Sequence, residues 1–131
     1  MPQVDVVDET WIAADPARVA ARVTDPANWS RWWPDLDLTV DELRGPEGVR
    51  WNLPNQKMQT PGVTGVVPRT AAGSMEVWLQ PDRDGVRVHY FLRLDPLGRA
   101  LPQRRVQRLV LAHRRRAKRV FWALKDELEA R

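Results

Sequence analysis

Cysteine is absent from the 131-residue sequence, histidine occurs only twice, and no apolar run approaches the roughly 18 residues needed to cross a bilayer. Without cysteine, a disulfide framework and a cysteine-based zinc site are excluded. The first residues also lack the basic and apolar segments of a secretory signal. We therefore expect a cytoplasmic protein, and a hydrophobic share of 43% predicts one globular domain over residues 1–131.

Recognisable catalytic motifs are missing as well. The sequence contains no H-E-x-x-H pair, aspartate-rich calcium loop, phosphate-binding glycine motif or G-x-S-x-G turn. It therefore predicts no metal and no cofactor, and it argues against a nucleophilic or metal-dependent enzyme. Acid–base catalysis stays open, because one histidine and one carboxylate suffice for it.

Positive charge is concentrated in the last quarter of the chain. Residues 99–131 carry eleven Lys and Arg against three Asp and Glu, a net charge of +8, whereas residues 1–98 carry a net charge of −4. A solvated helix face explains this charge, and neither a helix-turn-helix nor an aromatic base-stacking platform accompanies it. Nucleic acid is therefore not a favoured partner.

Apolar periodicity and capping residues divide the chain into elements. Alternating β-branched and acidic residues predict a strand over 4–12, and two Asp-Pro pairs predict short helices near 16–24 and 26–33. The longest element is a helix from about 103 to 129, with apolar residues on one side and arginines on the other. One side of this helix is therefore expected to face a core or a ligand.

Between these helices, a period of two predicts β-hairpins. The first hairpin pairs 36–40 with 49–53, and a loop near 54–62 and an irregular strand follow it. An antiparallel sheet connected in this way must cover one face, and the apolar side of the long helix is the expected cover.

The second hairpin has a clearer pattern. A turn over 81–85 predicts that Met75 faces Tyr90 on the apolar side and that Glu76 lies opposite His89 on the other side. We interpret Glu76 and His89 as an exposed cross-strand pair rather than a catalytic one.

Candidate functional residues lie on the inward faces. His113 interrupts the apolar side of the long helix, so it is either a core histidine with one polar partner or a group that orients a ligand or moves a proton. Trp29, Trp32 and Trp33 crowd the second short helix, and Trp51 lies on the apolar side of its strand. These tryptophans either pack the core or line an apolar ligand cavity.

Trp122 lies about 160° from the centre of the apolar side of the long helix. It shares the outward side with Leu111, Arg115, Lys118 and Arg119. A tryptophan among cations can anchor a protein at an anionic membrane or an acidic partner. Alternatively, it stacks on the stems of the neighbouring cationic side chains.

Several strings, in their order along the chain, resemble a known superfamily. The START-like, or SRPBCC, superfamily opens with strings similar to ETWIAADP at 9–16 and TDPANWSRWWP at 24–34. Its actinobacterial branch of polyketide cyclase/dehydrase-like and lipid-transport-like proteins is similar to GSMEVWL at 73–79, HYFLR at 89–93 and FWALKDEL at 121–128. The resemblance covers essentially the whole chain.

This resemblance implies an α+β helix-grip fold. In that fold a curved antiparallel sheet wraps around a long C-terminal helix, two short helices follow the first strand, and an apolar cavity lies between sheet and helix. The implied function is binding or transport of a hydrophobic small molecule such as a lipid, isoprenoid or polyketide. The candidate ligand-binding residues are Trp32, Trp33, Trp51, Met75, Val77, Val88, Tyr90, Leu92, His113, Ala117 and Phe121.

Two other functions stay open. One is a polyketide aromatase/cyclase-type enzyme, in which His113, Tyr90 or Glu76 supplies protons to a reactive chain. The other is an interaction module that uses the basic helix face to contact an anionic membrane or an acidic protein. Its candidate surface consists of Leu111, Arg115, Lys118, Arg119 and Trp122.

Overall fold

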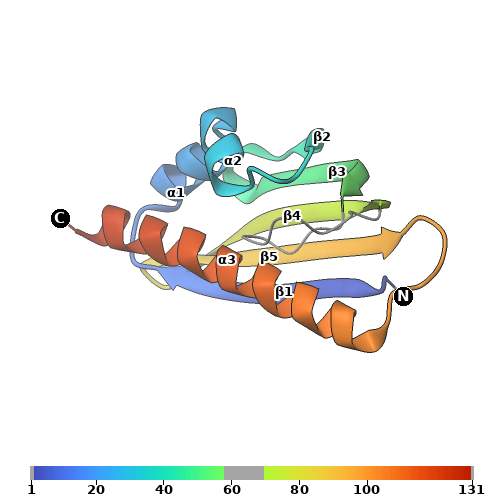
Figure 1. Ribbon diagram of the computed structural model, residues 1–131. Helices are drawn as coiled ribbons and strands as arrows, with labels where there is room; N and C mark the ends of the chain where they lie inside the picture. The colour runs from blue at the N-terminus through green and yellow to red at the C-terminus, as the bar shows by residue number, and fades with distance from the viewer. Residues whose placement is uncertain (1, 58–69, 131) are drawn as a thin grey trace.

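Five antiparallel strands form one curved sheet, and a long C-terminal helix lies across one of its faces (Figure 1). The computed structural model describes residues 2–57 and 70–130. In chain order the elements are β1 (Val4–Ile12), α1 (Pro16–Val23), α2 (Pro26–Trp32), β2 (Thr39–Leu43), the short 3-10 helix η1 (Gly45–Glu47), β3 (Gly48–Lys57), β4 (Thr70–Asp82), β5 (Gly85–Pro96) and α3 (Gln103–Glu129).

The strand order across the sheet is β1-β5-β4-β3-β2, so β1 and β2 are the outer strands. α3 runs along the β1 and β5 side, and α1 and α2 stand beside it (Figure 1). This arrangement is the predicted α+β helix-grip fold, and that prediction is confirmed. Within the described ranges, no helix has the length and apolar character needed to span a membrane.

The two short helices begin where the Asp-Pro pairs predict. The Asp15 carboxylate accepts a hydrogen bond from the Ala17 backbone N–H at 2.9 Å, and Asp25 accepts from Ala27 at 3.0 Å. Each following proline occupies the first turn, where its missing N–H has no hydrogen bond to lose. The predicted ranges agree with α1 and α2 to within one residue.

The turn between β4 and β5 is shorter than predicted. Asp82 pairs directly with Gly85, so only two residues form the turn, and Arg83 adopts a positive φ of 58°. Val77 therefore lies opposite Tyr90, whereas the sequence predicted Met75 opposite Tyr90. The predicted register is wrong by two positions, but an even shift keeps every side chain on its predicted face.

The same shift separates the predicted pair of Glu76 and His89. Glu76 lies opposite Phe91, and His89 lies opposite Trp78 with ring centroids 4.5 Å apart. The prediction that Glu76 and His89 face each other is therefore wrong, because the two-residue turn moves each partner along the ladder.

The first hairpin also differs from its prediction. β2 begins at Thr39 rather than at residue 36, and all five of its residues are exposed. β3 continues to Lys57, so the expected loop does not begin at Pro54. The register shifts between Leu53 and Gln56, and such an irregularity tolerates a proline without a ladder N–H. The rest of the expected loop and the start of the irregular strand, residues 58–69, lie outside the described residues.

α3 is attached to β1 through two lysines. Lys118 Nζ donates to the Glu9 carbonyl at 2.8 Å and lies 3.2 Å from the Asp8 carboxylate. Lys125 Nζ donates to the Trp11 carbonyl at 2.9 Å. These contacts fix the helix along the outer strand, while its apolar side packs on the inner face of the sheet.

Candidate functional site

Three aromatic rings pack together between the sheet and α3. The indole of Trp33 stacks on Tyr90 with centroids 5.4 Å apart, and the Phe121 ring lies 6.1 Å from Trp33 and 6.0 Å from Tyr90. Trp33 follows the last residue of α2, Tyr90 lies on β5, and Phe121 lies on α3. All three side chains are buried, so elements far apart in the sequence meet at this cluster.

A buried positive charge borders the aromatic cluster. The Arg116 guanidinium lies 5.4 Å from the ring centroid of Trp33 and forms an ion pair with Asp35. Its Nη2 lies 3.2 Å from His113 Nδ1. Because a guanidinium can only donate, Nδ1 must accept, and the neutral imidazole carries its proton on Nε2.

This environment keeps His113 uncharged at neutral pH. Burial lowers the pKa of His113 to about 4, and the charge of Arg116 acts in the same direction, against a smaller opposite influence of Asp35. Burial also raises the pKa of the Tyr90 hydroxyl far above its usual range. At neutral pH the cluster therefore offers a neutral imidazole and a protonated phenol.

Four buried polar atoms of the interior have no hydrogen-bond partner among the described residues: Trp33 Nε1, Trp51 Nε1, Tyr90 Oη and Arg116 Nε. Each can donate a hydrogen bond, and three of them can do nothing else. An unpaired buried donor costs about 1–3 kcal/mol. Because buried polar groups in native proteins are nearly always paired, these donors are the feature of the interior that most needs an explanation.

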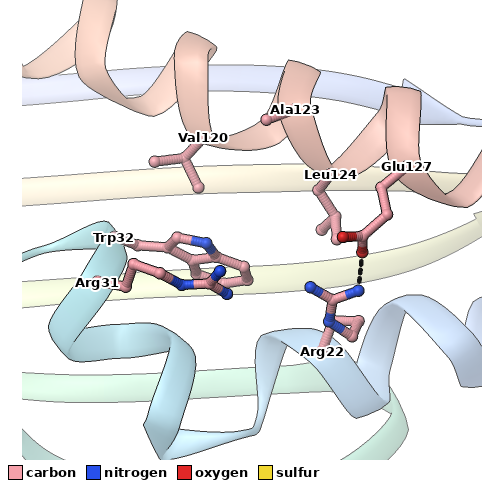
Figure 2. Close-up of a pocket in the computed structure, with 7 residues that line it drawn as sticks. All are labelled: Arg22, Arg31, Trp32, Val120, Ala123, Leu124 and Glu127. Carbon is pink, nitrogen blue, oxygen red and sulfur yellow. Dashed lines mark ion pairs between the residues drawn. The ribbon is translucent and has the colours of Figure 1, made fainter.

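A pocket of about 120 Å³ opens between α2 and α3 (Figure 2). An ion pair between Arg22 and Glu127 links its two sides. The Trp32 ring lies 6.5 Å from Trp33 and 6.4 Å from Phe121, so it stands between the pocket and the aromatic cluster. The lining residues are Arg22, Arg31, Trp32, Val120, Ala123, Leu124 and Glu127.

The volume of this pocket limits what it can hold. About 30 Å³ is the share of one water in the liquid, and pockets for drug-sized ligands usually measure roughly 300–1,000 Å³. A larger molecule that entered through this pocket would therefore reach the aromatic cluster only if Trp32 moved aside.

The structure brings most of the predicted ligand-binding residues together. Trp32 is partly buried at the pocket, and the others are buried in the core: Trp33, Trp51, Met75, Val77, Val88, Tyr90, Leu92, His113, Ala117 and Phe121. Among the catalytic candidates, Tyr90 and His113 share this interior. Glu76 lies on the other face of the sheet, where it pairs with Arg44 at 2.9 Å and Arg50 at 3.4 Å, so it is not brought together with them.

The sequence interpretation did not identify Arg116 or Asp35. Arg116 follows His113 by three residues, a spacing that places both on neighbouring positions of one helix side, and this could have been noticed. Asp35 lies 81 residues earlier, and no local pattern links it to α3. In residues 2–57 and 70–130, the structure groups no three metal-ligating side chains. Among the residues described, His113 is the buried imidazole of this interior, and its acceptor nitrogen is occupied by Arg116.

Four of the five residues of the predicted outer surface are exposed, and the fifth, Lys118, contacts β1. Leu111 is 44% exposed and Trp122 is 57% exposed, and Arg115 and Arg119 are exposed beside them. Lys118 turns toward β1, with its ammonium 5.7 Å from the centroid of the Trp122 ring.

No protein-family model matches this sequence, and a search of curated proteins found no match. Several solved structures are similar in fold. KanY has a TM-score of 0.54 and 18% identity, and the alignment covers 98% of this chain and 99% of that chain. DynU16, from the dynemicin biosynthetic locus, has a TM-score of 0.54 and 17% identity over 95% of this chain and 49% of that chain.

Ara h 8.0201 has a TM-score of 0.51 and 12% identity over 97% of this chain and 98% of that chain. At these identities the matches show a shared fold, the helix-grip fold of Bet v 1-like proteins. Membership of the SRPBCC superfamily that the sequence resembles, and of its actinobacterial branch, stays a prediction.

Proposed function

We propose that this chain binds a hydrophobic small molecule between the sheet and α3, and that the molecule carries at least one hydrogen-bond acceptor. Suitable ligands are lipids, isoprenoids or polyketide-like molecules with a carbonyl, carboxylate or phenolic oxygen. The fold supports the first part of the proposal, because the superfamily that the sequence resembles implies an apolar cavity between the sheet and the helix.

The unpaired donors support the second part of the proposal, that the ligand carries a hydrogen-bond acceptor. Trp33 Nε1 and Arg116 Nε belong to side chains in direct ring contact, and the Tyr90 hydroxyl belongs to the ring that stacks on Trp33. A pure hydrocarbon would leave all of these donors unpaired, whereas an acceptor oxygen would pair with one or more of them. The same donors would also orient the ligand in the interior.

Trp32 gives the ligand a route into this interior. It is the partly buried ring between the pocket and the cluster, and the Arg22–Glu127 ion pair lies beside it. The pocket is smaller than the ligands proposed, so binding requires Trp32 to change its position. Uptake is therefore expected to be slow compared with diffusion to an open site.

Catalysis of the aromatase/cyclase type is a second candidate, because the neutral His113 and Tyr90 share the interior. In this version His113 Nδ1 would exchange its contact with Arg116 for a substrate proton, and Tyr90, whose pKa burial raises, would donate a hydrogen bond to a substrate oxygen rather than release its proton. Glu76 has no part in this version, because it lies on the opposite face of the sheet.

Two fluorescent probes with one ring system test the binding proposal. 1-Anilinonaphthalene-8-sulfonate carries acceptor oxygens, and N-phenyl-1-naphthylamine lacks them. The wild-type protein should bind both probes with one-to-one stoichiometry. Tyr90→Phe and Trp33→Phe each remove one donor, and each should weaken binding of the sulfonate about fivefold, the equivalent of about 1 kcal/mol, with less than a twofold change for the neutral probe.

Trp78→Phe is the matched control, because Trp78 lies on the outer face of the sheet and should change neither affinity. If folded wild-type protein binds neither probe, ligand binding is refuted. If the donor variants weaken both probes equally, the acceptor requirement is refuted while binding itself stands.

A further inference from the structure

The outward side of α3 is a continuous basic face with two exposed apolar residues. At about 100° per residue, its members fall within a sector about 100° wide on the side of the helix opposite its apolar side, and one edge of the sector, at Lys118, lies next to β1. We call this surface the outer face of α3; it consists of Arg104, Arg108, Leu111, Arg115, Lys118, Arg119 and Trp122.

The arginines of this face and the neighbouring Arg114 are available to an external anion. All five are exposed, and none forms an ion pair with a carboxylate of residues 2–57 or 70–130. By contrast, Arg22, Arg44, Arg50 and Arg87 all have carboxylate partners. The first acidic residue of α3 is Asp126, so Arg104 to Arg119 is a stretch without negative charge.

The apolar members of the face lie along its middle. Leu111 and Trp122 are eleven residues apart, which places them about 17 Å apart along the axis and within about 20° of one line. The ammonium of Lys118 lies over the Trp122 ring, and Lys118 is itself held by Asp8 and Glu9 of β1. The exposed indole is therefore positioned by the fold rather than free to collapse onto the helix.

We infer that the outer face of α3 docks on an anionic phospholipid surface. Lipid headgroups would neutralise the exposed arginines, and the Trp122 indole is suited to the level of the headgroups, where its apolar body and its N–H are both accommodated. Leu111 would add a second shallow apolar contact. Each basic residue near such a surface contributes about 1 kcal/mol, or about fivefold in affinity, and the attraction falls within a Debye length.

Two observations favour lipid over nucleic acid. Apolar side chains lie in the middle of the cationic face, where contact with phosphates alone would gain nothing from them. One side of the Trp122 ring is also occupied by Lys118, which hinders stacking with a base. The basic charge is therefore arranged for a surface that combines anionic groups with an apolar layer.

Docking in this orientation leaves the pocket uncovered. Val120, Ala123 and Leu124 line the pocket from the side of α3 that faces α1 and α2 (Figure 2). That side lies more than 100° around the helix from Leu111. A docked molecule would hold the pocket beside the membrane rather than against it. The inference does not depend on what the interior binds.

Vesicle co-sedimentation of the full chain in 0.1 M salt tests this inference. Wild-type protein should bind vesicles of phosphatidylcholine with 30% phosphatidylserine at least tenfold more tightly than vesicles of phosphatidylcholine alone. Arg115→Gln/Arg119→Gln should weaken binding roughly 25-fold, at about fivefold for each charge. Brominated lipid should quench part of the tryptophan emission, and Trp122→Phe should abolish that part.

Arg83→Gln/Arg93→Gln is the matched control, because it removes the same formal charge from the β4–β5 turn and from β5 rather than from the helix. It should change vesicle affinity less than twofold. Absence of binding to the anionic vesicles would overturn the inference, and so would an equal loss in the control variant. Binding of duplex DNA or RNA that depends on Trp122, with no binding of vesicles, would assign the face to nucleic acid instead.

Discussion

Arg116 donates a hydrogen bond toward His113, with Nη2 3.2 Å from Nδ1, and the acceptor nitrogen belongs to a ring that burial already keeps neutral. Protonation of His113 would replace this acceptor by a second donor beside a cation. The contact therefore links the stability of the fold to pH.

The stability of the protein should fall as the pH drops below 6.5. The folded pKa of His113, about 4, lies below the unfolded value of 6.5, so its contribution is fully present above pH 6.5 and is lost as the pH falls through 4. Between pH 7.5 and pH 5 this amounts to about 2 kcal/mol of unfolding free energy. Urea unfolding at the two pH values measures it.

Two variants distinguish the contribution of His113 to the pH dependence of stability from that of His89. His113→Gln retains an acceptor for Arg116 and should remove most of the pH dependence. Burial also lowers the pKa of His89, but His89 is on the outer face of the sheet, and His89→Gln should keep most of the dependence. A pH dependence that survives in His113→Gln would contradict the assignment.

Asp35 and Arg116 should respond unequally to removal of their charges. The Arg116 side chain is 8% exposed and that of Asp35 is 33% exposed. Asp35→Asn leaves a buried guanidinium without a counter-charge and should cost about 3 kcal/mol or more. Arg116→Met leaves a carboxylate that water can reach and should cost clearly less. Equal losses of unfolding free energy would show that the burial of Arg116 is not the deciding factor.

Tyr90→Phe should leave the protein at least as stable as the wild type. The variant removes an unpaired buried hydroxyl without changing the ring, and loss of an unsatisfied group can be neutral or stabilising. We expect an unfolding free energy equal to that of the wild type or up to about 1 kcal/mol higher, together with the weaker sulfonate binding described above. A destabilisation above 1 kcal/mol would mean that the hydroxyl has a partner in solution.

Trp32→Ala should accelerate ligand uptake. Removing the ring that separates the pocket from Trp33 would extend the pocket to the aromatic cluster. Stopped-flow mixing with N-phenyl-1-naphthylamine should show a severalfold faster association than in the wild type. Trp122→Ala removes the same side chain from the opposite side of α3 and should leave the rate unchanged. Unchanged association in Trp32→Ala would place the ligand route elsewhere.

The elements that the sequence predicts well are those determined by local interactions. Asp15 and Asp25 bond to backbone groups two residues away, so the starts of α1 and α2 are readable from the sequence. The alternation in β4 and β5 shows which side chains face inward. The exact register was not readable, because it depends on Arg83 adopting a positive φ that turns usually assign to Gly, Asn or Asp.

The site was less predictable because its contacts join distant segments. Trp32 and Trp33 are adjacent and chemically identical, and their roles differ only because the helical backbone ends between them; Trp33 has φ −127° and ψ 60°. That end turns one indole toward Tyr90 and leaves the other at the pocket. The partnership of Asp35 with Arg116 likewise exists only after α3 has packed beside α2.

The lysine contacts between α3 and β1 also bear on aggregation. β1 is an outer strand, and such strands offer backbone groups to which a strand of another molecule can add. Lys118 and Lys125 occupy two of its carbonyl oxygens, which are then not available to a strand of another molecule. The opposite margin, β2, is only five residues long, has an irregular register and carries Asp41 and Glu42. Both margins therefore resist sheet extension between molecules at high protein concentration.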